Sequence, residues 1–133
     1  MEIEQSIELF DKSLKYEKYS RDLRTRAIYW KAEAEYRLAD YEKAKEDYEL
    51  FIGIPGARQM SESNLISYNL GYTYFNLKDY SNALTQFRTF ESGVTDAKPE
   101  IQIDTKLRIA DCYFITTNYQ QAVSYYDKVI DYG

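Results

Sequence analysis

Apolar residues recur at three- and four-residue intervals along most of the chain, with polar and charged residues between them. This spacing gathers the apolar side chains on one face of an α-helix. The first such stripe predicts a helix over residues 2–15, and it consists of Ile3, Ile7, Phe10 and Leu14. Further helices are predicted over residues 21–38, 41–52, 61–77, 80–91, 99–116 and 119–131. The pattern therefore predicts an all-α fold of about seven helices.

Capping and turn residues separate these predicted helices. Ser20 and Asp40 are expected N-caps, because a short polar side chain can accept a hydrogen bond from the first turn. Residues 53–56, which read GIPG, and residues 93–98 interrupt the helical pattern, and Pro99 suits the first turn of a helix. The turns within each pair of helices are tight, so each pair is expected to form an antiparallel hairpin.

The chain repeats itself with a period of 39 residues. Similar or identical residues are aligned at this interval: Asp40, Asp79 and Asn118; Tyr41, Tyr80 and Tyr119; Ala44, Ala83 and Ala122; Tyr48, Phe87 and Tyr126; Ala32, Gly71 and Ala110; and Tyr36, Phe75 and Phe114. Several matches in one register at a fixed period are typical of an array of stacked structural repeats.

Residues 69–87 read NLGYTYFNLKDYSNALTQF, and this stretch resembles one helix–turn–helix unit of the tetratricopeptide repeat family. The matching positions are Leu70, Gly71, Tyr74, Ala83 and Phe87. The family's aromatic residue near the start of the first helix is replaced by Ser67, and in the preceding repeat Lys31 and Glu35 stand where Leu70 and Tyr74 would be expected. Lys31 and Glu35 lie four residues apart, so they are expected to pair on one helix face.

The resemblance implies a right-handed α–α superhelix that forms a single domain over residues 1–133. It divides the chain into half a repeat over 1–19, consisting of a second-type helix, and three repeats over 20–58, 59–97 and 98–133. The family repeat commonly has 34 residues, so these units are elongated, as in tetratricopeptide proteins of the bacterial cell envelope. The resemblance therefore suggests a segment of a longer protein from the bacterial periplasm or cell envelope.

Composition and charge exclude several classes of function. The net charge of −5 argues against nucleic acid as the main partner, and the basic residues between Lys12 and Arg26 are interrupted by Glu17 and Asp22. The longest apolar run, residues 50–57, is too short and broken to insert into a membrane. The sequence contains no histidine and only one cysteine, Cys112, which has no activating partner. We therefore expect neither an enzyme nor a bound cofactor or metal.

The remaining candidate site is the concave face, which the first helix of each repeat is expected to line. Its predicted partner-binding residues are Arg26, Tyr29, Glu33, Tyr36, Arg37, Leu65, Tyr68, Asn69, Tyr72, Phe75, Asn76, Leu107, Arg108 and Asp111, with Asp104, Phe114 and Ile115 on the same face. Among its aromatic residues, Tyr29, Tyr68 and Tyr72 are expected to face the groove. Tyr36, Phe75 and Phe114 are expected chiefly to pack between neighbouring helices.

Some tetratricopeptide domains hold the carboxylate at the end of a peptide with basic and amide side chains. The corresponding residues here are Tyr29, Glu33, Asn69, Asp104 and Arg108, and the two acidic ones would repel a carboxylate. The sequence therefore favours a scaffold that binds another kind of peptide, or a helix, of a partner protein. The alternative is a structural spacer or a self-assembly segment that associates end to end through apolar residues such as Val123 and Tyr126.

Overall fold

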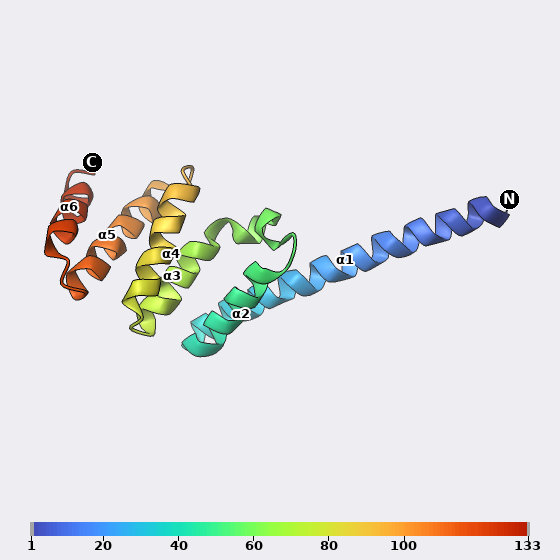
Figure 1. Ribbon diagram of the computed structural model, residues 1–133, viewed down its shortest axis with the longest axis horizontal. Helices are drawn as coiled ribbons and strands as arrows, with labels where there is room; N and C mark the ends of the chain where they lie inside the picture. Colours follow the sequence, from blue (N-terminus) through green and yellow to red (C-terminus); the bar gives the residue numbers. More distant parts are fainter. Residues whose placement is uncertain (1, 133) are drawn as a thin grey trace.

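The computed structural model describes residues 2–132, apart from the side chains of residues 2–4, 6, 7, 10 and 14. Its α-helices are α1 (Glu2–Arg37), α2 (Tyr41–Gly53), α3 (Ile66–Asn76), α4 (Tyr80–Gly93), α5 (Pro99–Ile115) and α6 (Tyr119–Ile130). Two short 3-10 helices, η1 (Ala57–Gln59) and η2 (Ser61–Leu65), precede α3. Consecutive α-helices pair into hairpins, and the hairpins stack along the chain (Figure 1). The predicted all-α helical-hairpin solenoid is confirmed.

The first helix differs from the prediction. Residues 2–37 form one continuous helix, so Ser20 lies inside α1 instead of capping a new helix. The expected break is wrong because the segment around Ser20 contains neither glycine nor proline, and each residue there can continue the backbone hydrogen bonding of the helix. The described chain accordingly has six α-helices where about seven were predicted. The apolar stripe from Ile3 to Leu14 lies outside the side chains that the structure describes.

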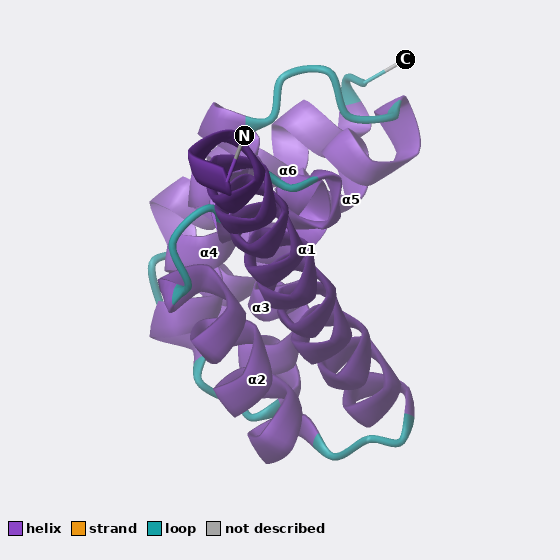
Figure 2. Ribbon diagram, turned by 90° about the vertical axis from the view of Figure 1, so that its right-hand side faces the viewer, coloured by secondary structure: helices purple, strands orange, loops and turns teal. Residues whose placement is uncertain are grey.

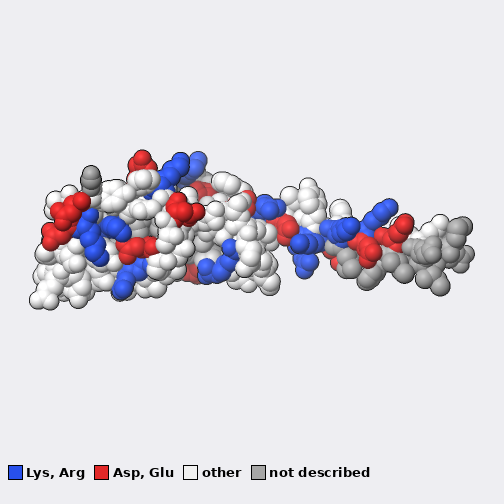
Figure 3. Space-filling model, turned by 90° about the horizontal axis from the view of Figure 1, so that it is seen from above, with Lys and Arg blue, Asp and Glu red and all other residues white. Residues whose placement is uncertain are grey.

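The N-terminal half of α1 extends beyond α2 and away from the stacked hairpins (Figure 1). Seen from this end, α1 lies in front and the later hairpins follow behind it (Figure 2). Basic and acidic side chains are interspersed both along α1 and over the hairpins (Figure 3). The surface that Figure 3 shows therefore carries no continuous basic stripe of the kind that binds nucleic acid.

The three hairpin turns share one backbone conformation. Ala39, Lys78 and Thr117, which stand 39 residues apart, have φ angles of +62°, +63° and +65°. The next residue of each turn donates its backbone N–H to a carbonyl of the preceding helix, at 2.8–2.9 Å. Asp40 then caps α2 by accepting a hydrogen bond from the backbone of Lys43 at 3.4 Å, which confirms its predicted role as an N-cap.

The core contains a close approach between α3 and α4 at Gly71. A Cβ atom at this position would lie 2.6 Å from Phe87 Cε1, nearer than real Cβ contacts allow. Phe87 is fully buried, and the rings of Tyr68 and Tyr72 lie 6.2 and 5.2 Å from its ring. Gly71 therefore makes room for an aromatic ring that its neighbours hold in place.

The irregular pair in the first hairpin also forms. Lys31 lies 3.9 Å from Glu35 on the same helix and 3.1 Å from Asp47 on α2. The nearby Asp47, together with burial, raises the pKa of Glu35 above its usual range. The predicted pairing of Lys31 with Glu35 is thus observed, with Asp47 as an additional partner.

Candidate functional site

Side-chain hydrogen bonds join the first helices of the three hairpins, α1, α3 and α5. The surface that these helices share, which we call the first-helix face, carries the partner-binding residues predicted from the sequence. Three groups of contacts organise it: one between α1 and α3, one between α3 and α5, and one at the start of α3.

Asn69 and Glu33 join α3 to α1. Asn69 Nδ2 donates hydrogen bonds to Tyr29 Oη at 3.1 Å and to Glu33 Oε1 at 2.6 Å. Tyr48 Oη, from α2, donates to the same Glu33 oxygen at 2.6 Å. Burial and the neighbouring Glu33 raise the pKa of Tyr29 and Tyr48 far above that of free tyrosine, so both hydroxyls stay protonated.

Asp104 and Arg108 join α5 to α3. Asp104 Oδ2 accepts hydrogen bonds from the hydroxyls of Tyr68, at 2.5 Å, and Tyr72. Arg108 donates to Tyr72 Oη at 3.0 Å and to Asp111 at 2.9 Å. Burial and the bond to Asp104 raise the pKa of Tyr72 to about 12, although Arg108 opposes the shift. These contacts fix the rings of Tyr68 and Tyr72 on the first-helix face.

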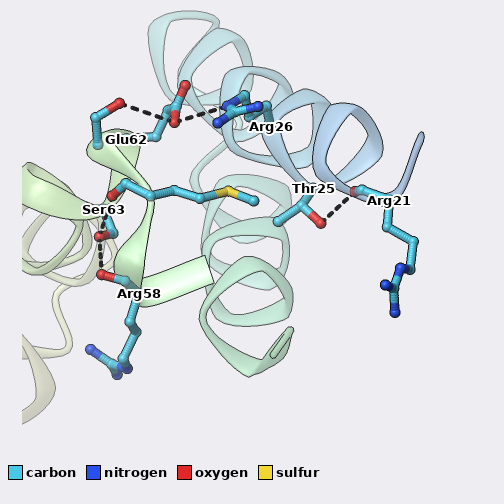
Figure 4. Close-up of polar contacts among 8 residues, drawn as sticks. Arg21, Thr25, Arg26, Arg58, Glu62 and Ser63 are labelled. Carbon is cyan, nitrogen blue, oxygen red and sulfur yellow. Dashed lines mark hydrogen bonds and ion pairs between the residues drawn. The ribbon is translucent and has the colours of Figure 1, made fainter. Parts of the chain in front are cut away.

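At the start of α3, Arg26 reaches from α1 to Glu62 in η2, with Nε 3.4 Å from Glu62 Oε1 (Figure 4). In the same region Ser63 Oγ donates to the backbone carbonyl of Arg58 at 2.7 Å (Figure 4). The first contact holds the connection between the first and second hairpins against α1, and the second joins η1 to η2 within that connection. Arg26 therefore has a structural partner within the chain.

Two cavities open beside these contacts. The smaller, of about 290 Å³, lies between α1 and α3 and is lined by Glu33, Tyr36, Arg37, Tyr48, Tyr68, Asn69 and Tyr72. The larger, of about 650 Å³, spans all three hairpins and is lined by Tyr29, Trp30, Ser61, Glu62, Asn64, Leu65, Gly93, Val94, Asp96, Ala97, Lys98 and Ile101. Six predicted site residues thus meet in the smaller cavity, and Tyr29 and Leu65 line the larger one.

Several site residues lie differently from the expectation. Tyr29 is only 5% exposed because its ring packs against Trp30, Tyr48 and Phe51, so its predicted exposure is wrong. Phe114, expected to pack between helices, is 55% exposed because no helix of the described chain covers that side of the third hairpin. Its equivalent Phe75 is half-buried.

Sequence reasoning also missed residues that line the cavities. Tyr48 comes from the second helix of its hairpin, and Trp30 is 56% exposed at the edge of the larger cavity. A signal for Tyr48 was present, because Glu33 and Tyr48 have the same separation as Asp111 and Tyr126. In the structure Tyr126 Oη donates to Asp111 at 2.6 Å, as Tyr48 does to Glu33.

The second hairpin replaces this pair of an acid and a tyrosine with two aromatic rings. Tyr72 and Phe87 occupy the equivalent positions, and their rings meet at 90° with centroids 5.2 Å apart. A carboxylate facing Phe87 would find no hydroxyl donor there and would be costly to bury. An acidic residue on the first helix therefore accompanies a tyrosine on the second helix, and an aromatic residue on the first helix accompanies a phenylalanine.

Among the side chains that the structure describes, no group of three or more potential ligands is placed to hold a metal ion. Burial, with a smaller effect of Asp111, raises the pKa of the Cys112 thiol to about 12. A thiol with this pKa is unreactive at neutral pH. In the described part of the chain, every helix is too short or too polar for a transmembrane segment.

Comparison with known proteins identifies the repeat. The family model described as tetratricopeptide repeat matches residues 25–57, 66–90 and 103–132. Each match covers most of one hairpin, from α1–α2 to α5–α6. No curated protein matches the sequence.

Proposed function

Because the chain belongs to the tetratricopeptide repeat family, we propose that it binds a peptide or helix of a partner protein on its first-helix face. Repeats of this family generally mediate protein–protein interaction, and stacked repeats present extended surfaces of this kind. The proposal concerns which face binds and through which residues.

The observation that carries the proposal is the row of rigid aromatic side chains on this face. Tyr36, Tyr68 and Tyr72 are half-buried, and hydrogen bonds to neighbouring helices hold their hydroxyls. Binding to such rings costs little side-chain entropy, because their conformation is already fixed. Tyrosine and tryptophan are also enriched among the residues that dominate binding energy at interfaces.

The test is selection of binding peptides from a displayed library with the purified chain as bait. Trp30→Ala removes an exposed ring from the larger cavity. We expect it to lower the affinity for the selected peptides at least about tenfold, which is typical of an interface hot spot. Tyr19→Ala, which removes an exposed ring from α1 outside both cavities, is the matched control. Failure to select any peptide, or equal losses in the two variants, would refute the proposal.

A second candidate function is end-to-end self-association through the third hairpin. The observation in its favour is the exposure of apolar side chains on α6, where Val123 is 59% and Ile130 76% exposed. Light scattering over a range of concentrations measures the association. A dimer that Val123→Glu abolishes would support this function, whereas a monomer at every concentration would exclude it.

A further inference from the structure

We propose that the 290 Å³ pocket between α1 and α3 binds a lysine or arginine side chain of the partner. This inference rests on the proposed function, because it assigns the chemistry of one position in the bound peptide. Three properties of the pocket support it: an acidic lining residue, Glu33, that forms no ion pair with any described residue; its aromatic walls; and its size.

The negative charge comes from Glu33 and Asp104. Glu33 lines the pocket, and Asp104 accepts hydrogen bonds from two of the lining tyrosines. Both carboxylates receive hydrogen bonds from neutral groups, and neither forms an ion pair with any described residue. Both of these bonds to Glu33 end at Oε1.

The positive groups nearby offset only part of this charge. Arg108 forms an ion pair with Asp111 at 2.9 Å and also interacts with Asp104, but it forms no ion pair with Glu33. Arg37, the last residue of α1, lines the pocket but is exposed, and water screens its charge. A cation that enters the pocket would therefore be attracted by Glu33 and Asp104 and opposed by Arg37 and, beyond the ring of Tyr72, by Arg108.

Tyrosines supply most of the pocket's remaining lining. Tyr36 comes from α1, and Tyr68 and Tyr72 come from α3, with the last two rings 5.1 Å apart at 72°. Aromatic faces attract ammonium and guanidinium groups within about 6 Å of the ring centroid. Arg108 already lies over the ring of Tyr72, 5.6 Å from its centroid, so Tyr36 and Tyr68 are the rings left to attract a ligand cation. The tyrosine rings also offer apolar surface to the methylene chain of a lysine or arginine.

Size and polarity disfavour the other classes of side chain. At about 290 Å³ the pocket lies at the lower end of the range for small-molecule sites, roughly 300–1,000 Å³, which suits one side chain. An apolar side chain would desolvate Glu33 and Asn69 without giving them a hydrogen bond. An acidic side chain would meet the carboxylate of Glu33, which forms no ion pair with any described residue.

The direct test uses Nα-acetyl-lysine methylamide as the probe and its Nε-acetylated form, which lacks the charge, as the control ligand. Backbone amide resonances of Glu33–Arg37 and Tyr68–Tyr72 in NMR spectra report binding at the pocket. We expect saturable chemical-shift changes with the charged probe. The acetylated probe should bind with an affinity at least about fivefold lower, the factor that corresponds to roughly 1 kcal/mol of cation recognition.

Two variants then test the charges. Glu33→Gln keeps an oxygen that can accept hydrogen bonds from Tyr48 and Asn69 but removes the charge. It should lower the affinity for the charged probe about fivefold. Arg37→Ala should raise the affinity for the charged probe by up to about fivefold, as expected for removal of an exposed like charge. Glu46→Gln, an exposed position on α2 that does not line the pocket, is the control for net charge and should change nothing.

The proposal is overturned if the charged probe causes no saturable shift at these amides, or if Glu33→Gln and Glu46→Gln behave alike. Its failure can be told apart from failure of the proposed function. Selected peptides that bind the first-helix face equally well in the Glu33→Gln variant would leave the proposed function intact and exclude the basic side chain. Binding of the probe by a chain that selects no peptide would support the cation-binding pocket and exclude the proposed function.

Discussion

Replacing Gly71 with alanine tests whether the close approach of α3 and α4 depends on the missing side chain. The added Cβ would lie 2.6, 2.7 and 2.9 Å from Cε1, Cδ1 and Cζ of Phe87. The ring of Phe87 is fully buried and is flanked by the rings of Tyr68 and Tyr72, so it cannot simply move aside. Either the ring or α3 itself must shift.

Two effects of opposite sign decide the result. Forcing an extra methyl group into a well-packed core costs about 1–3 kcal/mol. Alanine in place of glycine inside a helix recovers about 1 kcal/mol, because glycine loses more backbone entropy on folding. We therefore expect Gly71→Ala to lower the free energy of unfolding by about 1 kcal/mol.

Urea denaturation followed by circular dichroism measures this change. Gly53→Ala and Gly93→Ala are matched controls, because each lies at the end of a helix and a Cβ there would meet nothing within 4 Å. Both controls should be neutral or slightly stabilising. The urea dependence of the unfolding free energy should be the same in all variants, so that the midpoints can be compared.

A double-mutant cycle isolates the contact with Phe87. Phe87→Leu removes the ring, and in that background Gly71→Ala should become neutral or stabilising, with a coupling free energy of about 2 kcal/mol. The reasoning is refuted if Gly71→Ala stabilises the parent chain, or if its effect is the same with and without the ring.

Three further predictions concern single turns and titrating groups. Thr117→Gly should stabilise the chain by about 1 kcal/mol in urea denaturation, because a β-branched residue is strained at φ +65°; unchanged stability would show that the turn carries no strain. Burial and hydrogen bonds to carboxylates raise the pKa of Tyr72, Tyr125 and Tyr126 to about 12. Since unfolded tyrosine ionises near 10, the contribution of these three tyrosines to stability should be constant below pH 10 and fall between about 10 and 12; a midpoint in urea that is independent of pH over that range would contradict this. Cys112, with its pKa raised to about 12, should react with a thiol reagent at pH 8 only at the rate of unfolding; immediate reaction of the native chain would disprove its burial.

Much of the fold follows from local signals in the sequence. Repetition of Asp40, Asp79 and Asn118 marks the three hairpin turns, and the small residues near the helix crossings include Gly71, where α3 and α4 approach closely. The continuation of α1 through Ser20 could not be predicted in this way. A residue type that is common at helix N-caps, such as serine, can also lie inside a helix. A polar segment without glycine or proline can therefore continue a helix, as α1 does.

The candidate site was predicted less well because it depends on how neighbouring hairpins meet. The spacing of Tyr29 and Tyr68 places both on first helices, but it does not say which ring a neighbouring element covers. Tyr29 is buried against Trp30 and Phe51, whereas Tyr68 stays half-exposed. Tyr48 belongs to a second helix and reaches the pocket only because the helices of its hairpin pack closely.

The alternation between an acid–tyrosine pair and an aromatic pair also limits how these repeats can be recombined. A chimera that joins the first helix of the second hairpin to the second helix of the third would place Tyr72 against Tyr126. The hydroxyl of Tyr126 would then lose Asp111, the carboxylate that accepts its hydrogen bond. The converse exchange would set Asp111 against the ring of Phe87. A recombined array therefore keeps each acid–tyrosine pair or aromatic pair only if both helices of a hairpin are taken together.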